Sequence, residues 1–415
     1  MNARTHAGAA LSALALAPPL ALGCLLRPAW REGIAERLGA HPARERAIWI
    51  HGASVGEARV GARIARALAQ RGESIAASAT TLTGRAQWCA LAPDVLAGLA
   101  PLDHPWCAER ALARVAPDLL VLVETELWPT WIARAHARGV RVALVSARIS
   151  ERSFPRYRRA RFLVARTLAR IDAIGARGEL DAERFVALGA VPARVFVTGD
   201  LKLEPDGAAV ELAPDLAARL GDTPLIVAGS THAGEEEAAL AALAAAEAAG
   251  LRAALVLAPR DVARASEVLA LARGRRVRVR SAGEGAPLRA GEVLVLDTLG
   301  ELAALWARAD VAFVGGSLAP GVGGHNLLEP AQHGRLVLHG PHVANAREAA
   351  ELLGACGGAE RVLDAADLAR AVVGALRDPA RASSRGATGR AATLANRGAL
   401  ERTLALLDRA RGASR

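Results

Sequence analysis

Short apolar runs alternate with amphipathic stretches along most of this chain. In the first half the apolar runs lie at residues 47–51, 74–79, 119–123, 141–145, 171–175 and 195–198. The pattern restarts at residues 225–228, 253–257, 277–280, 293–296, 311–314 and 337–339. Short apolar strands separated by helical patterns are typical of parallel sheets built from βαβ units. The pattern predicts two doubly wound α/β domains, with the cleft between them as the default site.

The boundaries of these domains follow from the same pattern. A chain of 415 residues exceeds what one hydrophobic core usually serves. We assign residues 1–30 to an apolar segment, 31–202 to the first domain, 203–222 to a polar linker and 223–415 to the second domain.

The N-terminal segment predicts a membrane anchor. Residues 8–26 are almost wholly apolar, and about 20 apolar residues span a bilayer. Arginines at 27, 31 and 37 follow the segment, which by the positive-inside rule puts the bulk of the chain in the cytoplasm. A signal peptide and a helix packed on the protein itself are the alternatives. We expect attachment to the cytoplasmic face of the inner membrane, by a spanning or a peripheral segment.

Composition narrows the function classes. The four cysteines share no CxxC spacing, which argues against a disulfide scaffold or a zinc ribbon. Aromatic residues make up only 3% of the chain, too few for a platform that stacks single-stranded nucleic acid. A net charge of +10 suits an anionic lipid surface, although codon bias also explains the excess of arginine. Lys202 is the only lysine.

Polar motifs follow several strands of the first half. Ser54 and Glu57 form a capping-box pattern, and Glu57 would also be placed as a general base. The loop from Thr80 to Arg85 suits an anion, or is a plain polar loop. Glu124 directly follows a strand, as a site residue or a salt-bridge partner, and Lys202 could stabilise negative charge.

A second series of motifs follows strands of the second half. Residues 229–232 precede a helix whose first turn is acidic, so capping is one explanation of this segment. Arg260 could hold a phosphate, and glycines at 315–316 and 321–324 let the backbone approach a ligand. Glu329 is placed for ribose hydroxyls. Neither GxGxxG nor a P-loop is present, which disfavours hydride transfer and NTP hydrolysis.

Taken in order, these motifs resemble the 3-deoxy-D-manno-octulosonic acid (Kdo) transferase family of lipopolysaccharide synthesis. The resemblance runs from about residue 30 to 400, and its most specific motifs are Glu-Thr-Glu-Leu-Trp-Pro and Gly-Gly-His-Asn. The matching stretches are residues 54–57, 124–129, 147–153, 199–202, 230–235, 300–302, 313–318 and 323–330. Departures from the family pattern are Asp261 in place of His, Ser146 in place of Asn and Gly199-Asp-Leu-Lys202 in place of Gly-Asn-Ile-Lys.

The resemblance implies a GT-B fold, with two Rossmann-like domains facing a cleft behind an N-terminal anchor helix. It implies inverting transfer of Kdo from CMP-Kdo to a lipid A precursor, with no metal or other cofactor. Glu57 aligns with the general base, and Glu124 and Lys202 align with positions that stabilise the transition state. We expect donor contacts from Ser230, Thr231, His232, Pro259, Arg260, Leu299, Gly300, Glu301, Gly316, Ser317, Asn326, Leu327, Leu328 and Glu329, and acceptor contacts from Ser54, Gly56, Thr80, Thr81, Thr83, Gly84, Arg148 and Arg152.

Three other functions compete with this interpretation. One is a GT-B enzyme that uses another nucleotide sugar, such as a UDP-sugar. Another is a basic nucleic-acid-binding protein, which the scarcity of lysine and aromatic residues disfavours. The last is an inactive membrane scaffold, against which the intact Glu57, Glu124 and Lys202 argue. We expect no nucleic-acid partner.

Overall fold

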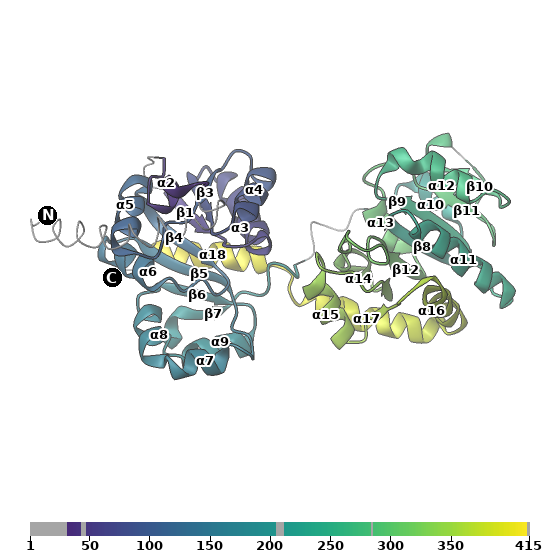
Figure 1. Cartoon of the computed structure of the whole chain (residues 1–415). Coiled ribbons are helices and arrows are strands. Elements are labelled where there is room, and N and C mark those ends of the chain that lie inside the picture. Colours follow the sequence, from purple (N-terminus) through teal and green to yellow (C-terminus); the bar gives the residue numbers. More distant parts are fainter. Residues whose placement is uncertain (1–30, 43–46, 205–210, 284, 413–415) are drawn as a thin grey trace, which may run out of the picture. The chain divides into compact units, whose positions relative to one another are not determined.

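The computed structural model describes residues 31–42, 47–204, 211–283 and 285–412. Contacts divide the chain into two units, one of Met1–Leu201 with Gly398–Arg415 and the other of Lys202–Arg397. Each unit is built around its own sheet (Figure 1). The expectation of two α/β domains with parallel sheets is therefore confirmed.

The first unit contains a seven-stranded parallel sheet in the order β3-β2-β1-β4-β5-β6-β7. Its strands are β1 (Ala47–His51), β2 (Ile75–Ala79), β3 (Leu96–Leu99), β4 (Pro117–Val123), β5 (Arg141–Ala147), β6 (Ala173–Ala176) and β7 (Val195–Val197). Strand β1 is buried on both faces because Ile48 and Ile50 enter one core and Ala47 and Trp49 enter the other. Burial on both faces explains why the strand has a continuous apolar pattern.

Helices of the first unit cover both faces of this sheet. Buried residues of α3 (Val55–Ala69) and α4 (Leu82–Leu91) pack on one face, and those of α5 (Pro105–Val115), α6 (Pro129–Ala137), α8 (Arg161–Leu168) and α9 (Glu179–Ala187) pack on the other. The remaining short helices are α2 (Ile34–Arg37), α7 (Phe154–Arg159) and the 3₁₀ turn η2 (Pro192–Arg194).

The last helix, α18 (Ala399–Gly412), belongs to the first unit (Figure 1). Its apolar side chains, including Leu404, Leu406 and Leu407, join the core that contains Ile48 and Ile50. The Arg402 guanidinium also donates to the carbonyl of Thr198 at 3.0 Å. The sequence assignment of all of residues 223–415 to the second domain was therefore wrong for this helix, because its apolar stripe completes the first core.

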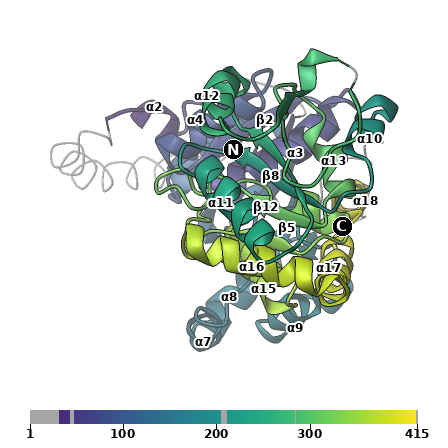
Figure 2. The ribbon, with the colours of Figure 1, turned by 90° about the vertical axis from the view of Figure 1, so that its right-hand side faces the viewer.

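The second unit contains a seven-stranded parallel sheet in the order β10-β11-β9-β8-β12-β13-β14. Its strands are β8 (Leu225–Thr231), β9 (Ala254–Pro259), β10 (Val277–Val279), β11 (Val293–Val295), β12 (Val311–Val314), β13 (Val337–His339) and β14 (Ala359–Arg361). Helices α11 (Glu235–Ala248) and α16 (Ala365–Arg377) lie side by side and contribute to the core on one face (Figure 2).

The other face of this sheet is covered by α10 (Pro214–Leu220), α13 (Leu302–Leu305), α14 (Leu328–Gln332) and α15 (Arg347–Ala355). The remaining elements are α12 (Ala265–Leu271), α17 (Pro379–Leu394) and the 3₁₀ turns η3 (Val262–Arg264), η4 (Arg280–Ala282) and η5 (Trp306–Arg308).

Several sequence expectations differ from the structure. The polar stretch predicted as a linker contains α10, which Leu216 and Leu220 anchor in the second core. Strands β3 and β14 were missed because each is short and lies at a sheet edge. The expected anchor at residues 1–30 lies outside the described residues. Within the described ranges, no helix is both long enough and apolar enough to span a membrane.

Candidate active site

The order of strands in the first sheet brings Glu57 and Glu124 to one region. Successive strands depart from β1 in one direction and from β4 in the other, although β1 and β4 are hydrogen-bonded neighbours. Such a reversal opens a crevice at the carboxyl ends of the two strands. The loop after β1 leads to Glu57 in the first turn of α3, and Glu124 directly follows β4.

The carboxylate of Glu57 is held by the start of its own helix. It accepts hydrogen bonds from the Ala53 N–H at 2.7 Å and from the Ser54 hydroxyl at 3.0 Å, and the Glu57 N–H donates to Ser54 Oγ at 3.5 Å. The capping box expected from the sequence is therefore confirmed. Gly52 is required beside it, because a Cβ there would lie 2.8 Å from the Glu57 backbone.

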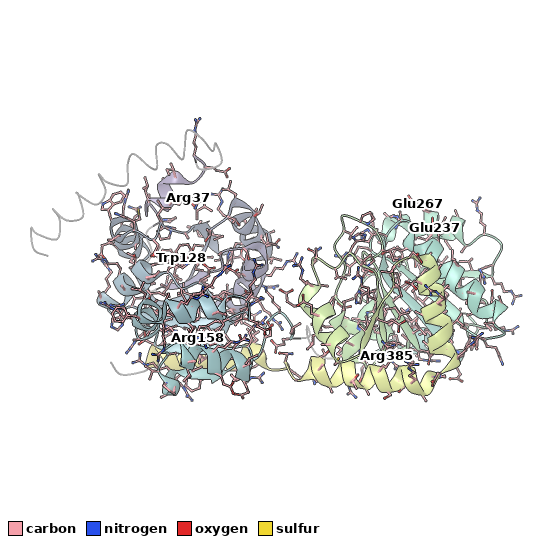
Figure 3. The ribbon with its side chains drawn as sticks, turned by 60° about the horizontal axis from the view of Figure 1, so that its bottom comes forward. Arg37, Trp128, Arg158, Glu237, Glu267 and Arg385 are labelled. Carbon is pink, nitrogen blue, oxygen red and sulfur yellow. The ribbon has the colours of Figure 1, made fainter. Side chains whose placement is uncertain are left out.

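Two further carboxylates accompany Glu57. Glu124 has φ of 62°, a left-handed conformation that non-glycine residues rarely adopt outside turns and functional sites. Glu126 accepts a hydrogen bond from the indole N–H of Trp128 at 2.6 Å, and its carboxylate lies 3.5 Å from His51 Nε2. Trp128 is labelled in Figure 3. Glu126 and His51 were absent from the residues chosen by sequence, although Glu126 lies within the recognised motif.

Burial and the charge of neighbouring carboxylates both affect the pKa of Glu57. Burial raises the pKa of Glu57, and the carboxylates of Glu126 and Glu124 raise it further. Hydrogen bonds from Ser54 and Ala53 act in the opposite direction, but the net pKa remains raised. A carboxylate with a raised pKa is a stronger base near neutral pH than an ordinary glutamate. The arrangement can therefore remove a proton from a hydroxyl.

The threonine loop lies beside the Glu57 loop. The backbone N–H groups of Thr80 and Thr81 both donate to the Ala53 carbonyl, at 3.1 and 3.3 Å. Thr81 also caps α4 by accepting from the Gly84 N–H at 3.0 Å, and Thr83 donates to Thr81 at 3.3 Å. These contacts support the structural interpretation of this loop, while Ala53 connects it to Glu57, because the Ala53 N–H donates to the Glu57 carboxylate.

The expected acceptor arginines lie on the segment after β5. The Arg148 carbonyl accepts a hydrogen bond from Thr125, which joins this segment to the loop that follows β4. Arg152 is exposed just before α7. The structure therefore connects Arg148 to the Glu124 loop through its backbone.

The second sheet has a corresponding reversal between its neighbours β8 and β12. Glu235, in the first turn of α11, connects the loops after these strands. Its buried carboxylate accepts from the backbone N–H groups of His232 at 2.9 Å, Gly316 at 2.6 Å, Ser317 at 2.9 Å and Leu318 at 2.8 Å. Gly316 and Ser317 were expected to contact the donor. In this structure their backbone N–H groups donate to Glu235.

Other expected donor residues of this loop pair are also tied into the fold. Ser317 is buried, and its hydroxyl donates to the Val314 carbonyl at 2.6 Å and accepts from the Gly340 N–H at 2.8 Å. The Thr231 hydroxyl donates to Glu236 at 2.9 Å. Ser230 has a left-handed φ of 54° between Gly229 and Thr231. Thr231 and Ser317 thus make hydrogen bonds within the fold, and their expected contact with the donor stays a prediction.

Three basic side chains, one exposed and two half-buried, lie at the carboxyl ends of strands of the second sheet. Arg260 follows β9 directly and is exposed, while Pro259 is the last buried residue of that strand. His232 and His325 lie in contact, with Nε2 atoms 2.9 Å apart. His325 was not chosen from the sequence, although it lies inside the recognised Gly-Gly-His-Asn motif.

The last group of expected donor residues lies near α13 and α14. Glu329 accepts from the indole N–H of Trp306 at 3.2 Å and from the Asn326 amide at 3.3 Å, while the side chains of Leu327 and Leu328 are buried in the core. Leu299 is 79% exposed and Gly300 has φ of 85°. Glu301 pairs with Arg280 at 2.7 Å.

Lys202 lies at the start of the second unit. Its ammonium is 3.2 Å from the Glu348 carboxylate on α15, and the lysine side chain is 18% exposed. Within the described residues, no group of three or more His, Cys, Asp or Glu side chains could hold a metal ion.

Comparison with known proteins assigns the chain to a class. The structure of MurG from Acinetobacter baumannii has a TM-score of 0.52 and 13% identity, and covers 88% of this chain and 99% of its own, which is a likeness of fold alone. The two parallel-sheet units accordingly resemble those of GT-B glycosyltransferases.

Sequence relatives identify the family. The model described as 3-deoxy-D-manno-octulosonic-acid transferase (kdotransferase) matches residues 32–205. The 3-deoxy-D-manno-octulosonic acid transferase of Bordetella pertussis is 37% identical over 382 residues, covering 87% of this chain and 86% of its own. The transferase of the same name from Haemophilus influenzae is 32% identical over 397 residues, with 92% of each chain covered. The chain belongs to the Kdo transferase family and is a glycosyltransferase.

Proposed function

We propose that this protein transfers Kdo from CMP-Kdo to a lipid A precursor, with inversion and without a metal ion, and that Glu57 is the general base. The observation that carries the mechanism is the position of Glu57 at the reversal between β1 and β4, with a pKa raised by burial and by Glu126 and Glu124. In this mechanism Glu57 takes the proton of an acceptor hydroxyl while its oxygen attacks the anomeric carbon. Direct attack inverts that centre and requires no covalent glycosyl-enzyme.

The second unit supplies the proposed donor site. Arg260 is exposed at the carboxyl end of β9, where a guanidinium suits the phosphate of CMP. Glu329 is already oriented by Trp306 and Asn326, which suits a hydrogen bond to ribose hydroxyls. Lys202 would stabilise negative charge on the donor in the transition state, with Glu348 holding its ammonium in the absence of donor.

A basic and apolar surface on α7 and α8 supports a membrane-bound acceptor. Phe162 and Leu163 are 72% and 66% exposed. Arginines surround them and are exposed as well, namely Arg156, Arg158, Arg159, Arg161 and Arg166, of which Arg158 is labelled in Figure 3. Exposed apolar groups among cations suit the headgroups of anionic lipid. We place this surface against the cytoplasmic face of the inner membrane.

The experiment is mass spectrometry of a tetra-acylated lipid A precursor after incubation with purified protein and CMP-Kdo. Wild type should add the mass of one or more Kdo residues, and the number of increments gives the number transferred. Glu57→Gln should reduce the rate by about 10²–10⁴-fold, the usual contribution of a general base. Glu183→Gln, at an exposed position on α9 outside the recognised motifs, is the matched control and should keep the full rate.

Each outcome has a separate meaning. No Kdo increment with intact donor and lipid would contradict the proposed reaction, and competition between CMP and UDP for binding would then test the UDP-sugar alternative. A full rate in Glu57→Gln would leave the reaction standing and limit Glu57 to its capping role. A rate that falls with EDTA and returns with a divalent cation would contradict metal-independent transfer.

A further inference from the structure

Two histidines of the second unit meet edge to edge. His232 follows β8 and His325 follows β12, and their Nε2 atoms are 2.9 Å apart. The ring planes are 7° from parallel, with centroids 5.2 Å apart. The centroid separation equals the Nε2–Nε2 distance plus about twice the distance from the centre of an imidazole ring to its nitrogen. The two ring centres and the two Nε2 atoms therefore lie nearly on one line, and the two rings are nearly coplanar. This is the geometry of a linear N–H···N hydrogen bond.

Backbone contacts build this histidine pair. The Glu235 carboxylate accepts from the N–H of His232 at 2.9 Å and from the N–H of Gly316 at 2.6 Å. The N–H of His325 donates to the Gly315 carbonyl at 3.2 Å. Gly315 must lack a side chain, because a Cβ there would lie 2.7 Å from the Glu235 carboxylate. One buried carboxylate and one glycine turn therefore fix the backbone of the two loops that carry the rings.

The hydrogen bond limits how many protons the pair can carry. Two neutral imidazoles hold two ring protons, one on the Nε2–Nε2 line and the other on Nδ1 of the accepting ring. One more proton can bind Nδ1 of the donating ring and leave the hydrogen bond intact. A further proton would have to bind the accepting Nε2 and would break the bond. The intact pair therefore has a charge of either zero or +1.

Burial and nearby charge favour the neutral form of His325 when no ligand is present. Burial lowers the pKa of His325, and His232 and Arg260 lower it further, while Glu235 acts in the opposite direction. Nearby acidic groups have their own hydrogen bonds: Glu236 pairs with Arg264 at 2.8 Å, and Asp261 accepts from the Ala263 N–H at 3.0 Å. On the β13 side, Gly324 faces the backbone of His342 and Val343.

We propose that His232 and His325 form a proton-linked phosphate site, in which the pair takes up a solvent proton when the phosphate of CMP binds between it and Arg260. The proposal rests on the proposed function only in placing the donor at this edge of the sheet. An anion beside the pair offsets the repulsion from Arg260, which makes the +1 state favourable. The proton binds a ring Nδ1 and returns to solvent when CMP leaves.

Proton uptake makes donor affinity depend on pH. Where binding takes up a proton, the dissociation constant rises with pH, by about tenfold per unit when the full proton is exchanged. The phosphate of CMP itself titrates with a pKa of about 6 and would release protons if it bound as the dianion. Binding of the dianion therefore opposes the expected effect, whereas proton uptake by the phosphate itself would persist in variants that lack either histidine.

The test is isothermal titration calorimetry of CMP binding to the full chain near neutral pH. The same titration is run in buffers with different ionisation enthalpies, such as PIPES and Tris, and the slope gives the protons exchanged. Wild type should take up close to one proton per CMP, and cytidine, which lacks the phosphate, should take up none. His325→Gln and His232→Gln should each abolish the uptake and weaken CMP binding. His342→Gln, on the neighbouring exposed loop, should retain it.

The outcomes separate this inference from the proposed function. CMP binding by wild type with no proton uptake would overturn the proton-linked site and leave the donor assignment intact. Uptake that persists in both His325→Gln and His232→Gln would also overturn it. Failure of wild type to bind CMP would overturn the donor assignment, and the inference would fall with it. The wild-type titrations decide the matter even where a variant fails to fold.

Discussion

The carboxylate of Glu235 and the backbone N–H of Ser317 are joined by a buried hydrogen bond of 2.9 Å across the reversal between β8 and β12. The residues are far apart in sequence, since Glu235 lies in the first turn of α11, after β8, and Ser317 lies on the loop after β12. Three further backbone donors, of His232, Gly316 and Leu318, converge on the same carboxylate. One acidic side chain therefore fixes the two loops that carry the histidine pair.

Removal of this carboxylate should be strongly destabilising. Glu235→Ala leaves four backbone N–H groups without their acceptor, and the second unit should lose about 3 kcal/mol or more of stability. Urea unfolding followed by circular dichroism measures the loss. Glu237→Ala is the matched control, because Glu237 is exposed on the same first turn (Figure 3) and its carboxylate accepts a hydrogen bond from the Gly234 N–H at 3.1 Å. Equal losses in both variants would contradict the role of Glu235.

The ionised carboxylate of Glu57 should lower the stability of the folded protein at neutral pH. Its pKa is raised in the folded protein, so the folded state binds this proton more tightly than the unfolded chain does. Ionised Glu57 therefore costs stability above the folded pKa, and the cost disappears as the pH falls below the unfolded pKa. Glu57→Gln should raise the melting temperature near neutral pH, with a gain that shrinks in acid. A variant that melts lower at neutral pH would show that the charged cap outweighs the cost of burial.

Glu126 should set the pH range in which Glu57 acts. Its negative charge raises the pKa of Glu57, so Glu126→Gln should lower that pKa and move the acidic limb of the rate profile to lower pH. The measurement is kcat against pH with saturating donor and acceptor. Glu183→Gln, exposed on α9, should leave the profile in place. A uniform fall in rate with an unmoved acidic limb would assign Glu126 a structural role only.

The C-terminal helix should be essential to the first unit. Leu407 is 1% exposed in the core that contains Ile48 and Ile50, so Leu407→Ala should cost about 2–5 kcal/mol. Asp408→Ala, on the next residue, removes an exposed ion pair with Arg71 and should cost at most about 1 kcal/mol. Both are compared by urea unfolding. A small loss in Leu407→Ala would contradict the packing of α18 on this core.

The sequence by itself determined most of the strands and the motifs that carry the chemistry. Buried parallel strands such as β1 and β12 are continuous apolar runs, and their predicted bounds match the structure. The capping box of Ser54 and Glu57 is a local pattern, because its partners are only three residues apart. Signals of this kind depend on neighbours in the chain, so they can be found without the fold. The short edge strands β3 and β14 have weak patterns and were missed.

Only the tertiary structure decided which distant groups meet. The charge of Glu126 acts on Glu57 because β1 and β4 are neighbours in the sheet, although the loops that carry them are far apart in the chain. The pairing of His232 with His325 depends in the same way on β8 and β12. The apolar stripe of α18 is visible in the sequence, but a stripe does not specify which core it will cover. Strand order and long-range packing supply that information, because they bring together groups that no local spacing relates.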